Sequence, residues 1–263
     1  ASKNPYSDWL KNQQIVLSDL KIHGDSKGFY PETLINRLKA FGYSTETLQF
    51  MLLPLVSELR DPVGSMGNDS ALACLSDQSR IIYDYFKQLF AQVTNPPLDA
   101  IREELVTSLG GSLGPEFNLL NPGPESCRQI ALDFPVIDND ELAKLIHVNA
   151  DGNRPGFAAH VVRGLFPVQG GGEALANRIT EIRLEVSQAI KDGAHIIVLS
   201  DRDGDAEDAP IPSLLLTAAV HHHLIREKTR TKVGLVVESG EVREVHHVAL
   251  LVGFGAAAIS VTV

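Results

Sequence analysis

The fold is decided by residues 195–199 (HIIVL), a run of apolar residues near the middle of the second half of the chain. A strand that is apolar on both of its faces must be covered on both faces, which is typical of parallel sheets. Three further runs of this kind are predicted to be strands, at residues 157–166, 233–237 and 257–263.

Helical patterns separate these four runs. Between the first two, apolar residues recur every three or four positions from Leu175 to Ile190, and Gly193 then ends the pattern as a C-terminal helix cap would. A second helix is predicted to start after Pro212, and a third to span Glu241 to Leu251. The order β-α-β-α-β-α-β over residues 156–263 predicts an α/β fold with a four-stranded parallel sheet and crossover helices, either half of a barrel or a small open sheet.

Residues 1–155 are predicted to form a mainly helical part of the same domain. Two glycine-rich loops interrupt this part, at residues 61–69 and 110–124. The predicted helices span residues 31–41, 45–59, 80–93 and 98–109.

The predicted last strand ends on Val263 with no helix after it. An apolar strand at the edge of a sheet promotes aggregation, so we expect this strand to have a neighbour in a longer native chain. We therefore expect the two parts to form one domain excised from a larger protein.

Composition narrows the class of protein and its partners. The chain has 263 residues, 44% of them apolar, and a formal net charge of -10. That charge argues against a nucleic acid or an anionic membrane as partner, because both are polyanions. Two cysteines, Cys74 and Cys127, are too few for a secreted disulfide scaffold, so we expect a cytoplasmic protein with reduced thiols.

Two clusters suggest ligand binding. His221, His222 and His223 are consecutive on one predicted helix, and His246 and His247 lie on the next. Consecutive helical residues point about 100° apart, so three in a row cannot reach one metal ion, and packing is the simpler interpretation. The acidic loop from Asp201 to Asp208 leaves the carboxyl end of a strand, where α/β sites usually form, but its glycine spacing is not that of a calcium loop. An independent domain that binds a metal or a small ligand through these clusters is the alternative hypothesis.

Other motifs are less specific. Gly170, Gly171 and Gly172 precede a helix and could hold a phosphate, but they match neither common phosphate-binding pattern. No nucleophile motif is present, so the residues alone indicate no catalytic site.

Several segments resemble the central domain of the glutamate synthase large chain. They are residues 61–70 (DPVGSMGNDS), 83–97 (YDYFKQLFAQVTNPP), 101–104 (IREE), 199–202 (LSDR), 209–212 (APIP), 219–224 (AVHHHL) and 243–247 (REVHH). The similarity extends from about Tyr6 to Ala256, nearly the whole chain.

This resemblance implies a connector with no catalytic, cofactor-binding or metal-binding residue of its own. In the family, an amidotransferase domain hydrolyses glutamine, and an FMN-binding domain of the same chain uses the ammonia to convert 2-oxoglutarate to glutamate. FMN and an iron–sulfur cluster belong to the parent enzyme, and this segment lacks the three or four thiolates that a cluster needs. The amidotransferase and FMN-binding domains are therefore the expected partners.

A connector of this kind is expected to contribute to the walls of the ammonia path. Such a wall must exclude water, and glycines allow the close backbone approach that this requires. The candidate segment for the channel or the domain junction consists of Gly64, Ser65, Met66, Gly67, Asn68 and Asp69.

Overall fold

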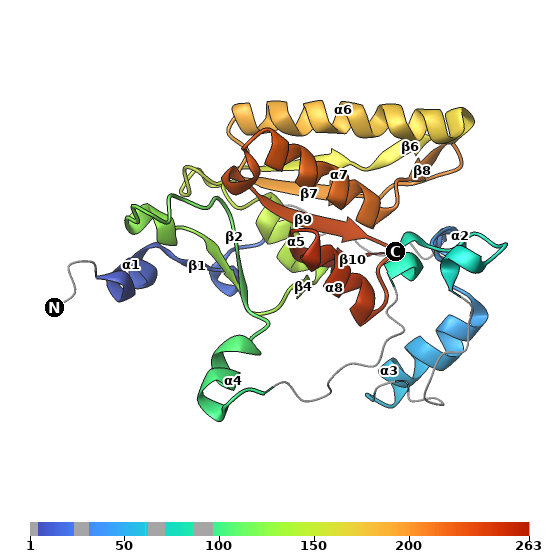
Figure 1. Cartoon of the computed structure of the whole chain (residues 1–263), viewed down its shortest axis with the longest axis horizontal. Coiled ribbons are helices and arrows are strands. Elements are labelled where there is room, and N and C mark those ends of the chain that lie inside the picture. The colour runs from blue at the N-terminus through green and yellow to red at the C-terminus, as the bar shows by residue number, and fades with distance from the viewer. Residues whose placement is uncertain (1–4, 24–31, 61, 63–71, 87–96, 263) are drawn as a thin grey trace. The chain divides into compact units, whose positions relative to one another are not determined.

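The computed structural model describes residues 5–23, 32–60, 62, 72–86 and 97–262 (Figure 1). The chain divides into two compact units. The first consists of Ala1–Lys27 and Gln88–Thr262, and the second contains Gly28–Lys87.

A five-stranded parallel sheet forms the centre of the first unit, with the strand order β4-β10-β9-β7-β5. Its strands are β4 (Val136–Ile137), β5 (Ala159–Arg163), β7 (Ile196–Ser200), β9 (Gly234–Ser239) and β10 (Ala256–Val261). The connecting helices are α6 (Gly171–Lys191), α7 (Ser213–Arg226) and α8 (Val245–Gly253). The predicted α/β class and the parallel order of the four long strands are confirmed.

Both faces of the central strands β7 and β9 are buried, as the apolar runs predict, whereas the edge strand β5 exposes Val161 and Arg163. Ile196 and Val198 of β7 pack into one core cluster together with residues of helix α5 (Asn139–Ile146). Ile197 and Leu199 pack into a second cluster together with residues of α6 and α7, which lie on the same side of the sheet (Figure 1). Successive residues of a strand point to opposite faces, so an uninterrupted apolar run is what two covered faces require.

The expectation that the last strand lies at an edge is wrong. β10 lies between β9 and β4, and Ile259 and Ser260 are in register with Val136 and Ile137 of β4. The edge strands are β4 and β5. The two-residue strand β4 has no sequence pattern of its own, because its pairing is with a strand more than a hundred residues later in the chain.

Smaller strands and helices complete the first unit. A three-stranded sheet has the order β1-β3-β2, in which β2 is antiparallel and β1 parallel to β3, and β6 pairs with β8 in a two-stranded antiparallel sheet. The remaining elements are α1 (Tyr6–Gln13), β1 (Ile15–Val16), η1 (Leu17–Asp19), α4 (Ala100–Val106), β2 (Gly111–Leu113), η5 (Pro124–Cys127), β3 (Ile130–Leu132), β6 (Leu165–Pro167), η6 (Val168–Gly170), β8 (Asp208–Pro210) and η7 (Arg230–Lys232).

These elements correct three sequence predictions. The run at residues 157–166 is two strands in different sheets, separated at Gly164, whose amide donates to the Ser200 carbonyl oxygen at 2.7 Å. The predicted loop at 110–124 contains β2. Helix α5 was missed, although Asp138 and Glu141 form a capping box at its start.

The second unit is helical in its described residues. It contains α2 (Leu34–Ala40), the π-helical segment η2 (Thr47–Leu52), α3 (Leu53–Ser57) and the 3₁₀ helices η3 (Ala73–Leu75) and η4 (Ile82–Phe86). The helix predicted at 31–41 is therefore shorter than expected. The helix predicted at 45–59 is π-helical in its first part and α-helical in its second. The described part of the helix predicted at 80–93 is 3₁₀ rather than α-helical, and its remainder lies outside the described residues.

The glycine at position 234 generates a test of the packing between β2 and β9. A Cβ atom at Gly234 would lie 2.3 Å from Leu113 Cδ1 and 2.9 Å from the Gly114 amide nitrogen. We expect Gly234→Ala to lower the free energy of unfolding by about 1–3 kcal/mol through overpacking, measured by urea denaturation. Gly172→Ala is the control, because a Cβ there meets no atom within 4 Å. Equal stability of the two variants would contradict this packing.

Candidate functional site

The carboxyl edge of the parallel sheet, where α/β proteins usually place their sites, holds a row of buried polar side chains. Ser200 of β7, Glu238 of β9 and Ser260 of β10 are in register with one another across the three strands. Their exposed fractions are 5%, 5% and 0%. Residues in register on parallel strands share a face, so these three side chains lie on the face that α5 covers.

Arg202 balances the charge of this row. Its Nε donates to Glu238 Oε1 at 2.6 Å, and the side chains of the pair are only 4% and 6% exposed. Glu238 also accepts a hydrogen bond from Ser200 Oγ, and Arg202 reaches Asn139 Oδ1 of α5 at 3.4 Å. The guanidinium group therefore ties β7, β9 and α5 together at one point.

Asp201 forms a second set of contacts, next to the row of Ser200, Glu238 and Ser260. Its carboxylate accepts hydrogen bonds from Ser239 Oγ and, at 3.2 Å, from the Gly240 amide. Burial raises the pKa of Asp201 to about 7, the neighbouring Glu241 and Glu238 add to this, and the two hydrogen bonds oppose it. Asp201 thus titrates near neutral pH in the folded chain.

Glu241 continues the network to the start of α7. Its Oε2 accepts hydrogen bonds from the backbone amide of Ser213 at 2.9 Å and from Ser213 Oγ at 2.6 Å. A carboxylate at the N-terminus of a helix is stabilised by the helix dipole and satisfies an amide that has no partner within the helix. Helix α8 begins at Val245, four residues after Glu241, where the sequence predicted its start.

The acidic loop from Asp201 to Asp208 is exposed only in part. Asp201 and Arg202 are buried, at 4% and 7% exposure. Asp205 accepts from the amides of Glu207 and Asp208 at 2.8 Å, which lowers its pKa, and Asp208 pairs with Arg163 at 2.8 Å. These carboxylates contact different partners and do not converge on one point.

The histidines of the predicted clusters also contact different partners and do not converge on one point. His221 Nδ1 accepts from Arg230 Nε at 3.0 Å, whereas His223 Nε2 contacts Ser187 Oγ at 2.7 Å. His247 is buried, and its Nδ1 accepts from the amide of Arg243 at 3.3 Å. Desolvation lowers the pKa of both His221 and His223. Within the described ranges, no group of three or more His, Cys, Asp or Glu residues is arranged to hold a metal ion.

The remaining sequence candidates take simple structural places. Gly170 ends a 3₁₀ turn, and Gly171, with φ +53, begins α6. Both cysteines are free thiols, Cys74 exposed and Cys127 half-buried.

The segment Gly64–Asp69, the candidate for the channel or the domain junction, lies outside the described residues. No helix among those described is long and apolar enough to cross a membrane.

Sequence reasoning missed most of the network at the carboxyl edge. It gave the acidic loop from Asp201 to Asp208 as a candidate site but did not include Ser200, Glu238 or Ser239. A usable signal was present, because Ser200 and Glu238 each end an uninterrupted apolar run, and the carboxyl ends of parallel strands meet at one edge of a sheet.

Fold and site together define an α/β domain whose parallel sheet is covered on both faces and whose carboxyl edge is filled by an internal ion-pair network. Comparison with known proteins identifies the family. The model of the glutamate synthase central domain matches residues 36–262. The chain belongs to this family.

Curated relatives agree with the match. The large chain of glutamate synthase [NADPH] from Bacillus subtilis is 42% identical over 263 residues, 99% of this chain and 16% of that one. Glutamate synthase [NADH] from Schizosaccharomyces pombe is 43% identical over 220 residues, 84% of this chain and 10% of that one. Ferredoxin-dependent glutamate synthase 2 from Synechocystis is 37% identical over 263 residues, 98% of this chain and 16% of that one. The chain thus spans a sixth or less of the length of these relatives.

The row of serines generates a matched pair of variants. Ser200 Oγ donates to Glu238, whereas Ser260 Oγ is buried with no hydrogen-bond partner among the described residues. We expect Ser200→Ala to lower the free energy of unfolding by about 1–3 kcal/mol, because it leaves the buried carboxylate one donor short. Ser260→Ala removes an unpaired group and is expected to be neutral or stabilising. Urea denaturation distinguishes the two, and equal losses of stability would contradict the assigned contacts.

Asp201 generates a pH prediction. In the unfolded chain its pKa is near the ordinary 3.8, and in the folded chain it is about 7. As the pH rises through this window, the unfolded state loses the proton first, so the contribution of Asp201 to stability falls and levels off above about pH 7. We expect Asp201→Asn to remove this decline, worth up to roughly 4 kcal/mol at about 1.36 kcal/mol per pKa unit.

The measurement is urea denaturation of the wild type and of Asp201→Asn at pH 5 and at pH 8. The variant is expected to gain stability relative to the wild type at the higher pH. A stability difference that is the same at both pH values would show that Asp201 does not titrate in this window.

Proposed function

We propose that the chain is the central connector domain of a glutamate synthase, the enzyme that forms two glutamate molecules from glutamine and 2-oxoglutarate. In this proposal it links the amidotransferase domain to the FMN-binding domain of the same parent chain, and the FMN and iron–sulfur cofactors belong to the parent enzyme. Residues 1–155 and 156–263 act as parts of one domain. The match of the family over residues 36–262 carries the proposal.

The chemistry of the carboxyl edge supports a role without catalysis by this segment. The charged groups at this edge are between 4% and 7% exposed. Arg202 pairs with Glu238, and Asp201 accepts a hydrogen bond from Ser239. Acids and bases that act on a substrate must reach it within hydrogen-bonding distance. Here the groups at the usual site of an α/β sheet are directed toward each other and hold the strands together.

Exposed apolar residues support contacts with other domains. On α4, Ile101 and Leu105 are four residues apart and 86% and 80% exposed, and Leu120 in the following segment is 96% exposed. Residues at this spacing share one face of a helix. Ile101 and Leu105 thus form an exposed apolar patch on α4, as is typical of interaction sites, and the neighbouring domains of the parent chain are the partners that fit.

We further propose that the segment Gly64–Asp69 contributes to the walls of the ammonia path. The glycines of that segment support this role, because glycine allows the close backbone approach that such a wall requires.

We also propose that the protein is cytoplasmic. The free thiols of Cys74 and Cys127 support this location, since disulfides are rare in the cytoplasm.

A segment exchange tests the connector function. The corresponding segment of the Bacillus subtilis large chain is replaced by this chain, which is 42% identical to it. We expect the chimera to retain formation of glutamate from glutamine and 2-oxoglutarate, measured together with glutamine consumption. In the control, a flexible linker replaces the segment, and glutamine hydrolysis is expected to persist while coupled synthesis is lost. A chimera that behaves like the linker control would contradict the proposal.

The same chimera tests the proposed wall of the ammonia path. Met66→Trp is expected to lower the yield of glutamate per glutamine hydrolysed, because a bulky ring would disturb the proposed wall and let ammonia escape. Leu75→Trp, at a position that is 73% exposed, is the control. Unchanged coupling in Met66→Trp would remove this segment from the path without affecting the connector proposal.

A further inference from the structure

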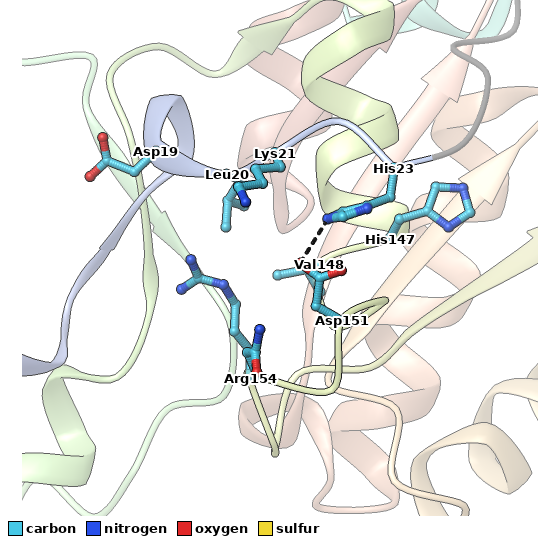
Figure 2. A pocket seen from close by; sticks show the side chains of 9 residues that line it. Asp19, Leu20, Lys21, His23, His147, Val148, Asp151 and Arg154 are labelled. Carbon is cyan, nitrogen blue, oxygen red and sulfur yellow. Dashed lines mark ion pairs between the residues drawn. The ribbon is translucent and has the colours of Figure 1, made fainter.

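A pocket of about 160 Å³ lies in the first unit between the end of η1 and the loop that follows α5 (Figure 2). It belongs neither to the network at the carboxyl edge nor to the segment proposed for the ammonia path. Its lining residues are Asp19, Leu20, Lys21, His23, His147, Val148, Asp151, Asn153 and Arg154.

The apolar lining residues anchor the pocket in the protein core. Leu20 and Val148 are 5% and 7% exposed and belong to the same buried cluster as β7 and β9. Their amides complete turns, from Leu20 to the Leu17 carbonyl oxygen at 3.2 Å and from Val148 to the Leu145 carbonyl oxygen at 3.4 Å. The two walls are therefore held by core packing.

A tight turn positions the arginine of the pocket. The Gly152 amide donates to the Asn149 carbonyl oxygen at 3.0 Å, and Gly152 has φ +69, a backbone conformation that favours glycine. The Asn149 side chain accepts from the Arg154 amide at 2.8 Å. Across the pocket, His23 Nε2 pairs with Asp151 Oδ2 at 3.2 Å and joins the two walls (Figure 2).

Some charged residues of the pocket have an ion-pair partner and others do not. Asp151 is engaged by His23, and the carboxylate of Asp19 is turned away from the centre of the pocket in Figure 2. The side chains of Lys21 and Arg154 have no ion-pair partner among the described residues. Arg154 is half-buried and extends toward the segment that carries Leu20 and Lys21 (Figure 2). Lys21 and Arg154 thus line the pocket as cations without an ion-pair partner among the described residues, beside the carboxylates of Asp19 and Asp151.

We propose that this pocket binds a small oxyanion through Arg154 and Lys21. The guanidinium group presents paired donors that match the two oxygens of a carboxylate or a phosphate, and Lys21 adds a point charge. The pocket volume of about 160 Å³ suits a small ligand. Inorganic phosphate and the carboxylate of a small acid share the required chemistry.

Titration of the full-length protein that carries this chain tests the proposal. Inorganic phosphate and succinate are titrated separately by calorimetry, at low ionic strength in a buffer without other oxyanions. At least one of them is expected to bind with a dissociation constant of about 1 mM or lower. Arg154→Gln and Lys21→Gln are each expected to weaken that binding roughly tenfold, because each removes a charge-assisted hydrogen bond.

Lys11→Gln, which removes an exposed cation on α1, is the matched control and is expected to bind like the wild type. The difference between the variants isolates this pocket from any other anion site in the full-length protein. Lys21 is exposed, so its substitution reports on binding even where Arg154→Gln perturbs the fold. Binding of phosphate alone, succinate alone or both, lost in the two pocket variants, supports the proposal and identifies the ligand. Absence of binding, or equal binding in the wild type and all three variants, overturns it without bearing on the connector function.

Discussion

The buried ion pair between Arg202 and Glu238 is the interaction on which the arrangement of the carboxyl edge depends. A parallel sheet covered on both faces cannot leave charged groups at its end without partners, because an unpaired buried charge costs several kcal/mol. Arg202 follows β7, Glu238 lies on β9 and Asn139 opens α5, so the pair forms only when these three elements are in register. Hydrophobic residues of similar shape could be equally stable, so we interpret the pair as a device that specifies register.

The sequence predicts those parts of the fold that are encoded locally. Four long strands, their parallel order and the helices between them follow from apolar runs and helical periodicity. The cap of α6 is an example, since Gly193 has φ +96 and the Ala194 amide bonds to the Ala189 carbonyl oxygen, as expected of a glycine cap. The short strands β2 and β4 could not be predicted, because two or three residues have no periodicity and these strands form through pairing with distant segments. This is also why β10 was wrongly expected at an edge.

The candidate site was harder to predict than the fold for a related reason. In the acidic loop after β7, Asp205 is exposed, whereas Asp201 is buried against Ser239 and Gly240. The partners of Asp201 are almost forty residues away in sequence, and only the adjacency of β7 and β9 brings them together. The histidine clusters illustrate the reverse case, because neighbours in sequence contact different elements in the fold, His221 with Arg230 and His223 with Ser187.

These two observations support the proposed connector role of this α/β domain in a family of enzymes. In most parallel sheets the carboxyl edge is open and its polar groups face a ligand. Here those groups bond to one another and join β7, β9, α5 and the start of α7. Internal bonding at this edge suits a domain whose proposed task is to hold two other domains in a fixed relation. Lys21 and Arg154, the cations proposed to bind an oxyanion, lie elsewhere, in the pocket between η1 and the loop after α5.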